Sequence, residues 1–175
     1  MDDSGFEIRP ATLDDCPGIL AVYNEAVLTT TATYDYEPRT LEHRQDWFVA
    51  RQRAGFPVLV AVDGAGRVAG WSALNPYHDR IGYRFTVENS VYVAAESRGR
   101  GLGSRLLAPL IPAGESRGFH AIIAAIDADN AVSLRLHERH GFMTVGRFRR
   151  VGFKFGRWLD VVYMERLLAE PRVSG

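Results

Sequence analysis

The stretch Val91-Tyr-Val-Ala-Ala-Glu-Ser-Arg-Gly-Arg-Gly-Leu-Gly-Ser-Arg-Leu-Leu107 decides the fold of this chain. It opens as an apolar strand, passes through a polar turn rich in glycine and arginine, and continues as an apolar helix pattern. Glycines let a ligand approach the backbone, where successive N–H groups and the helix dipole favour an anion. The stretch therefore predicts a phosphate site, and the alternative is a surface turn that caps a helix.

The spacing of the glycines narrows the kind of phosphate ligand. No Gly-Lys-Ser/Thr follows them, so the turn is not a P-loop. The dinucleotide fingerprint Gly-x-Gly-x-x-Gly is also absent, because no glycine follows at the third position after Gly101 or Gly103. What remains is Arg98-x-x-Gly101-x-Gly103 directly after a strand, with positive charge from three arginines: Arg98, Arg100 and Arg105.

Composition limits the class of protein. With 175 residues, 46% of them apolar, we expect a single domain over residues 1–175 with a core of about residues 6–168. The formal net charge is zero, which argues against nucleic-acid and membrane partners. Cys16 is the only cysteine, so an internal disulfide is impossible and a reducing compartment is expected. No apolar run approaches a membrane span, and we expect a soluble cytoplasmic protein.

Hydrophobic periodicity predicts about seven strands and four helices. The expected strands are residues 6–9, 58–62, 68–74, 86–94, 120–127, 142–153 and 158–166, with residues 120–127 buried on both faces. The expected helices lie between Thr12 and Val27, between Thr40 and Gly55, from Leu102 to Ser116 and from Ala131 to His140. Pro109 and Pro112 predict a kink or break in the third helix. The order indicates an α/β protein with a mixed, mostly antiparallel sheet and helices on both faces, and a parallel strand–helix–strand unit around the glycine turn.

The strand before the glycine turn carries an unusual face. Alternation places Arg84, Thr86, Glu88, Ser90 and Tyr92 on one side and Phe85, Val87, Val91 and Val93 on the other. A central strand does not bury such a polar face without partners. The face is expected to line a ligand site, and the alternative is a structural hydrogen-bond network.

Asn130, Leu134 and His137 share one face of the last helix, at i, i+4 and i+7. Asn130 and His137 could address one elongated ligand from there. Taken singly, Asn130 has the position of a helix cap and His137 that of a packed helix histidine.

These motifs together resemble the GCN5-related N-acetyltransferase (GNAT) superfamily. The Arg98–Gly103 turn and Asn130-x-x-Ser133-x-x-Leu136-x-x-x-x-Gly141-Phe142 carry the superfamily resemblance. Thr86–Val93, His137 and Gly152–Asp160 are similar to the branch that acetylates phosphinothricin and methionine sulfoximine. The resemblance implies the GNAT fold, splayed between the fourth and fifth strands, and acetyl-coenzyme A as co-substrate without a metal.

The resemblance also implies roles for the residues. Glu88 would be the general base that deprotonates the α-amine of an amino-acid analogue, and His137 the general acid or a partner of the base. The residues implied for acetyl-coenzyme A are Val91, Tyr92, Val93, Arg98, Gly99, Arg100, Gly101, Leu102, Gly103, Ser104 and Asn130. The residues implied for the substrate are Tyr36, His78, Arg80, Tyr83, Arg84, Ser90 and Tyr92.

Two other functions remain open from the sequence. One is the same chemistry on another small amine or on a protein N-terminus. The other is a non-catalytic acyl-coenzyme A sensor, which would require empty base and acid positions, whereas Glu88 and His137 fill both. The family resemblance further implies a homodimer, with the apolar C-terminal strands as a plausible interface.

Overall fold

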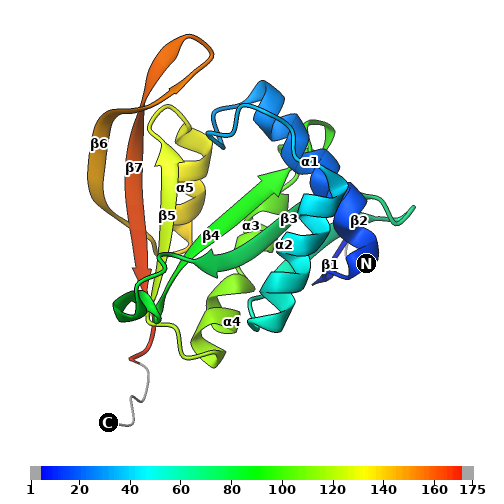
Figure 1. Ribbon diagram of the computed structural model, residues 1–175, viewed down its shortest axis with the longest axis horizontal. Helices are drawn as coiled ribbons and strands as arrows, with labels where there is room; N and C mark the ends of the chain where they lie inside the picture. Colours follow the sequence, from blue (N-terminus) through cyan, green and yellow to red (C-terminus); the bar gives the residue numbers. More distant parts are fainter. Residues whose placement is uncertain (1–4, 171–175) are drawn as a thin grey trace. The chain divides into compact units, whose positions relative to one another are not determined.

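The computed structural model describes residues 5–170 and contains a seven-stranded sheet in the order β1-β2-β3-β4-β5-β7-β6. The strands are β1 (Phe6–Pro10), β2 (Val58–Asp63), β3 (Val68–Pro76), β4 (Thr86–Val93), β5 (Ala121–Asp127), β6 (Met143–Lys154) and β7 (Arg157–Leu167). The helices are α1 (Cys16–Thr29), α2 (Leu41–Arg53), α3 (Leu102–Leu107), α4 (Leu110–Ser116) and α5 (Ala131–Arg139). The predicted order of elements and the mixed sheet with flanking helices are confirmed (Figure 1).

The chain divides into two compact units. Among the described residues, one comprises residues 5–73 and 90–107, and the other comprises residues 74–89 and 108–170. Both β3 and β4 pass from one unit into the other. The prediction of a single domain therefore stays a prediction.

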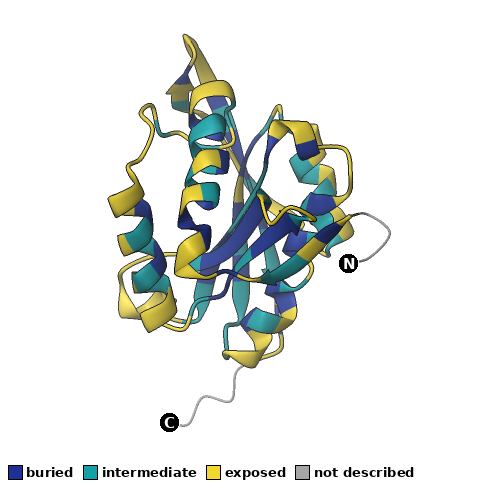
Figure 2. Ribbon diagram, turned by 90° about the vertical axis from the view of Figure 1, so that its right-hand side faces the viewer, coloured by how far each residue is buried: buried dark blue, intermediate teal, exposed yellow. Residues whose placement is uncertain are grey.

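In the first unit, helices pack on both faces of the strands. One face of β2 and β3 packs against α1 and α2 through buried residues such as Ile19, Phe48, Val60 and Trp71. The opposite face packs against α3 through Leu102 and Leu106. The apolar spacing of each helix explains this arrangement, because only one stripe of each is buried (Figure 2).

The second unit holds the parallel pair β4–β5 and the antiparallel neighbours β7 and β6. Pairing between β4 and β5 runs from Thr86↔Ala121 to Glu88↔Ile123, although the strands extend to Val93 and Asp127. This early end of the pairing matches the predicted splay between the fourth and fifth strands. Both helices of the unit contact the same sheet face: α4 comes close to Ile122, and α5 lies over β5 (Figure 1).

Two details of the sequence prediction need comment. The third predicted helix is broken, because α3 ends at Leu107 and α4 begins at Leu110. Pro109 occupies the N-cap position of α4, and Pro112 lies in its first turn, where the backbone N–H would have no partner within the helix. The expectation that residues 120–127 are buried on both faces is wrong. Ile122, Ala124 and Ile126 are buried, but Ala125 on the opposite face is exposed, because neither helix of this unit covers that face.

Candidate active site

Strand β4 has the predicted alternation from Thr86 to Val93. Val87 is fully buried on the side of α4 and α5, and Glu88 points to the opposite face of the sheet. In the first unit, Tyr92 packs with the α1–α2 core and Val93 with the α3 core. The prediction fails at Arg84, because Ile81–Tyr83 form a 3-10 turn that Arg84 closes, before the strand begins.

Glu88 has the properties of a general base. Its side chain is half-buried, and burial raises the pKa of the carboxyl above its ordinary value. Within residues 5–170, no hydrogen bond or ion pair holds this carboxylate. A carboxylate with a raised pKa and free lone pairs can accept a proton from a bound ammonium group near neutral pH.

His137 lies on the other face, in a buried network with Asn89. The Nε2 atom of His137 is 2.9 Å from Asn89 Nδ2, and Nδ1 is 2.8 Å from the backbone oxygen of Ser133. A carbonyl oxygen only accepts, so Nδ1 carries the proton and Nε2 accepts from the Asn89 amide. Burial lowers the pKa of His137, which keeps the ring neutral.

This geometry gives no support to His137 as a general acid. Both ring nitrogens have protein partners, and Nε2 has no proton to donate. The ring also packs edge-on against Phe142, at 5.0 Å between centroids. His137 thus resembles the packed helix histidine that the sequence allowed as the alternative.

One further polar residue, Asn130, lies at the start of the helix that carries His137. Asn130 caps α5: its side-chain oxygen accepts the Ser133 N–H at 3.0 Å, as a helix cap does. The sequence prediction overlooked Asn89, although a polar residue between Val87 and Val91 on an apolar strand face was the available signal. Its Oδ1 atom is buried and has no protein partner.

In the first unit, the glycine turn presents backbone to solvent. Gly99 and Gly101 have φ values of 75° and 76°, and a Cβ at either position would meet nothing within 4 Å. Within the described part of the chain, neither residue donates its N–H to a backbone acceptor. Together with the free N–H groups at the start of α3, this turn can cradle an anion.

Glu25 on α1 holds the turn in place, and sequence reasoning missed it. One carboxylate oxygen accepts from the Ala95 N–H at 3.2 Å, and the other accepts from the Arg98 guanidinium at 3.2 Å. Arg98 also donates to the backbone oxygen of Val93 at 3.1 Å, which ties the end of β4 to the turn. Arg98 therefore shapes the turn rather than adding free charge to it.

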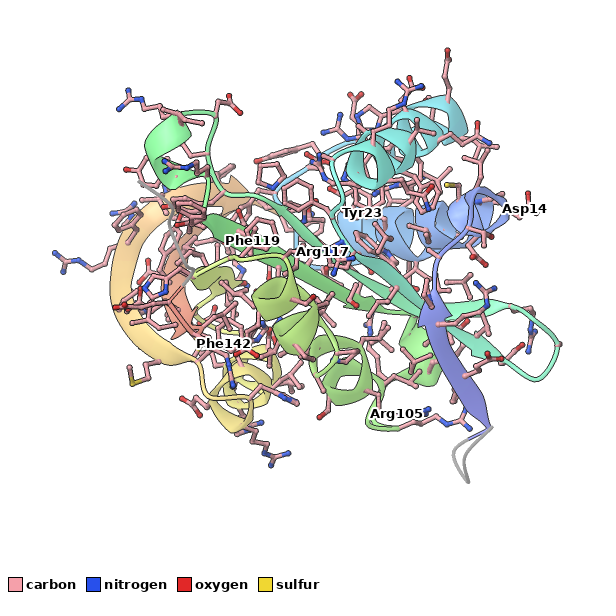
Figure 3. All side chains as sticks on the ribbon, turned by 90° about the horizontal axis from the view of Figure 1, so that it is seen from below. Asp14, Tyr23, Arg105, Arg117, Phe119 and Phe142 are labelled. Carbon is pink, nitrogen blue, oxygen red and sulfur yellow. The ribbon has the colours of Figure 1, made fainter. Side chains whose placement is uncertain are left out.

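The other two arginines of the motif lean toward β1. The Arg100 guanidinium lies 4.5 Å from the centre of the Phe6 ring, and Arg105 donates to the Phe6 backbone oxygen at 2.9 Å (Figure 3). The anion-binding capacity of this turn thus rests on its backbone N–H groups.

Aromatic residues line the substrate side of the first unit. The Tyr92 ring stacks on Trp71 at 4.9 Å and meets Tyr23 edge-on at 5.3 Å. Tyr23 projects from α1 beside α2 (Figure 3), and its hydroxyl donates to Asp35 at 2.7 Å. Asp35 fixes the loop that presents the exposed Tyr36.

The remaining predicted substrate residues lie in the second unit. Tyr83 contacts both His78 and Tyr77, with ring centroids at 5.1 and 5.6 Å. Arg84 lies over the Phe85 ring at 4.3 Å, whereas the exposed Arg80 guanidinium contacts no acceptor within the described residues. Of the two arginines, Arg80 is thus the one available to a substrate carboxylate.

The predicted residues therefore form two groups, one in each unit, that β4 connects. Tyr36, Ser90–Val93 and the glycine turn belong to the first unit. Glu88, Asn130, His137 and residues 78–84 belong to the second. No cluster of three or more metal-ligating side chains occurs in residues 5–170, and no helix there is long and apolar enough to cross a bilayer.

Comparison with known proteins decides the family. The model of the acetyltransferase (GNAT) family matches residues 19–142. This chain belongs to the GNAT acetyltransferase family. The resemblance inferred from its motifs is confirmed.

Relatives of this GNAT protein carry more specific names. It is 49% identical to an L-methionine sulfoximine/L-methionine sulfone acetyltransferase from Pseudomonas paraeruginosa, over 94% of this chain and 96% of the relative. It is 38% identical to a phosphinothricin N-acetyltransferase from Streptomyces coelicolor, over 93% and 96%.

Solved structures give the same fold. A phosphinothricin acetyltransferase from Sinorhizobium meliloti in complex with acetyl-coenzyme A superposes with a TM-score of 0.92 at 35% identity, over 98% of this chain and 92% of the other. A ribosomal-protein-alanine N-acetyltransferase from Brucella melitensis superposes with a TM-score of 0.90 at 45% identity, over 93% and 99%.

Proposed function

We propose that this protein transfers the acetyl group of acetyl-coenzyme A to the α-amine of an amino-acid analogue such as methionine sulfoximine, methionine sulfone or phosphinothricin. The observation that carries the proposal is the half-buried, unpaired carboxylate of Glu88 on the strand that leads into the glycine turn. The names of the relatives support the acceptor class.

The residues of the first unit fit acetyl-coenzyme A. A pyrophosphate needs N–H donors and open space, and the turn at Gly99–Gly103 offers both. When bound, the co-substrate supplies an acetyl thioester, which is the electrophile. The backbone N–H groups of Val91–Val93 are the donors that we propose for the negative charge that develops on the thioester oxygen.

The acceptor amine must lose a proton before it can attack. An α-amine is mostly ammonium at neutral pH, so it has no lone pair. We propose that Glu88 removes this proton and that Arg80 binds the substrate carboxylate. Because His137 Nε2 accepts a hydrogen bond, the departing thiolate takes its proton from elsewhere.

A substrate panel tests the proposal. Purified protein is mixed with acetyl-coenzyme A and each amine in turn, and the release of free thiol and the mass of the product are measured. We expect thiol release and an N-acetyl product with methionine sulfoximine, methionine sulfone or phosphinothricin. Absence of thiol release with every amine would contradict an enzymatic function and favour an acyl-coenzyme A sensor.

A protein N-terminus is the second acceptor to test, because one structural neighbour is named a ribosomal-protein-alanine N-acetyltransferase. Its arm of the panel uses a peptide that begins with alanine. Turnover of the peptide at a higher kcat/KM than the amino acids would move the proposal to protein acetylation.

We also propose a homodimer in the cytoplasm. Strand β6 is the edge of the sheet, and large apolar side chains on β6, β7 and their turn are about half exposed: Met143, Val145, Phe148, Val151, Phe153, Phe155 and Trp158. An exposed apolar edge of this kind is normally covered by a partner.

The proposed cytoplasmic location rests on Cys16. Its free, buried thiol fits a reducing compartment.

A further inference from the structure

Tyr163 on β7 shares a sheet face with Glu88, and no role assigned so far uses it. Glu88 pairs with Ile123 across β4–β5, and Tyr163 pairs with Ala125, two residues further along β5. Paired residues of neighbouring strands project to the same side, as do residues two apart on one strand. The backbones of Glu88 and Tyr163 are thus two strand spacings apart across the sheet and two residues apart along it, roughly 12 Å in all.

Ile123 and Ala125 of β5 lie between them on this face, and Ile123 beside Glu88 is partly buried. Ala125 is exposed and carries only a methyl group, and Gly146 of β6 pairs with Tyr163 on its other side. Both helices of this unit, α4 and α5, contact the opposite face. The sheet face between Glu88 and Tyr163 therefore carries the small, exposed Ala125, and no helix of their own unit covers it.

The Tyr163 hydroxyl is a potential hydrogen-bond donor on this face. Burial raises the pKa of Tyr163, and the nearby negative charge of Glu88 raises it further, as does Tyr77. The hydroxyl thus keeps its proton at neutral pH. Its ring is held from the side by Phe148, at 5.0 Å between centroids.

The acceptors named for the relatives share a chemical feature. Methionine sulfoximine, methionine sulfone and phosphinothricin each carry a tetrahedral sulfur or phosphorus with oxygen, a few bonds from the α-amine. Such an oxygen accepts a hydrogen bond, and the thioether of methionine is only a weak acceptor.

We propose that Tyr163 is a specificity-determining residue, whose hydroxyl donates a hydrogen bond to the side-chain oxygen of the acceptor while Glu88 faces its amine. This inference rests on the proposed function. It assigns discrimination between oxidised and unoxidised side chains to the sheet face around Ala125 and Tyr163, and leaves binding of the substrate carboxylate to Arg80.

The test is Tyr163→Phe, which removes the hydroxyl and keeps the ring that contacts Phe148. We measure kcat/KM for L-methionine sulfone, and L-methionine is assayed as a substrate and as a competitive inhibitor. Loss of one such hydrogen bond should lower kcat/KM for the sulfone roughly 5- to 20-fold, mainly through KM. The constants for methionine and the KM for acetyl-coenzyme A should stay within about twofold of wild type.

Two outcomes overturn the inference: unchanged kinetics with the sulfone, or an equal loss with sulfone and methionine. A wild-type protein that acetylates none of methionine sulfoximine, methionine sulfone and phosphinothricin would overturn the proposed function, and the inference with it. Tyr163→His, which keeps a ring N–H donor, serves as a second variant. If the hydrogen-bond donor decides specificity, Tyr163→His should prefer the sulfone over methionine more strongly than Tyr163→Phe does. Equal preferences in the two variants would count against the inference.

Discussion

Glu88, the proposed general base, illustrates how a buried carboxylate lowers stability. Burial disfavours the ionised carboxylate, and no partner within the described residues compensates. The folded protein therefore holds the Glu88 proton to a higher pH than the unfolded chain does. As pH rises from the ordinary glutamate pKa through the raised one, the folded state loses stability relative to the unfolded state.

The variant Glu88→Gln should consequently be more stable than wild type at pH 7, because the amide has no charge to desolvate. At a pH below the ordinary pKa of glutamate the two proteins should unfold with nearly equal free energies. Urea denaturation at both pH values measures this difference. A destabilised Glu88→Gln protein at pH 7 would mean that the carboxylate has a stabilising partner in the fold.

For single residues, the sequence analysis identified candidate positions more reliably than it assigned their roles. Glu88 stood out because a carboxylate interrupts a strand whose other face is apolar. Asn89 and His137 lie 48 positions apart, and their hydrogen bond depends on how α5 packs on the sheet. No periodicity within either element carries that information, so the buried network appears only in the structure.

Among the contacts between elements, the one between α1 and the glycine turn bears most directly on the proposed binding of acetyl-coenzyme A. Glu25 bridges the Ala95 N–H and the Arg98 guanidinium, and Arg98 in turn holds the end of β4. The two glycines Gly99 and Gly101 face open space and add no packing to the turn. We therefore expect this bridge to contribute to the shape of the turn.

The variant Glu25→Ala should raise the KM for acetyl-coenzyme A roughly 3- to 10-fold, the range expected for losing hydrogen bonds with a charged partner. Its kcat should change less, because Glu25 is not among the reacting groups. Glu42→Ala, an exposed glutamate on α2, is the matched control and should leave both constants near wild type. An unchanged KM in Glu25→Ala would show that the turn keeps its shape without the bridge.

Most of the fold could be predicted from element patterns. Glycines and caps fixed the ends of α2 and α5, and Asp63–Gly66 marked the β2–β3 hairpin, because these signals are local. Burial of β5 was predicted less well, since an apolar run does not reveal which face a helix will cover. The face of β5 that no helix of its unit covers carries Ala125, which pairs with Tyr163 of β7.

At the scale of the whole molecule, the exposed apolar edge formed by β6 and β7 predicts self-association. The variant Val145→Lys/Val151→Lys places two charges on side chains that are 53% and 56% exposed. Neither residue is in the core, so we expect the fold to persist and a dimer to become a monomer. Light scattering after size-exclusion chromatography gives the mass, and a wild-type mass of 19.5 kDa would contradict the dimer.

The central claim is that Glu88 deprotonates an amino-acid α-amine for acetyl transfer. The most direct measurement is kcat with methionine sulfoximine for wild type, Glu88→Gln and the exposed control Glu138→Gln, over a range of pH. We predict that Glu88→Gln lowers kcat roughly 100-fold or more with little change in the KM for acetyl-coenzyme A, and that Glu138→Gln matches wild type. The wild-type kcat should fall as the pH drops through the raised pKa of Glu88. A Glu88→Gln protein that keeps the wild-type kcat and pH profile would contradict the account.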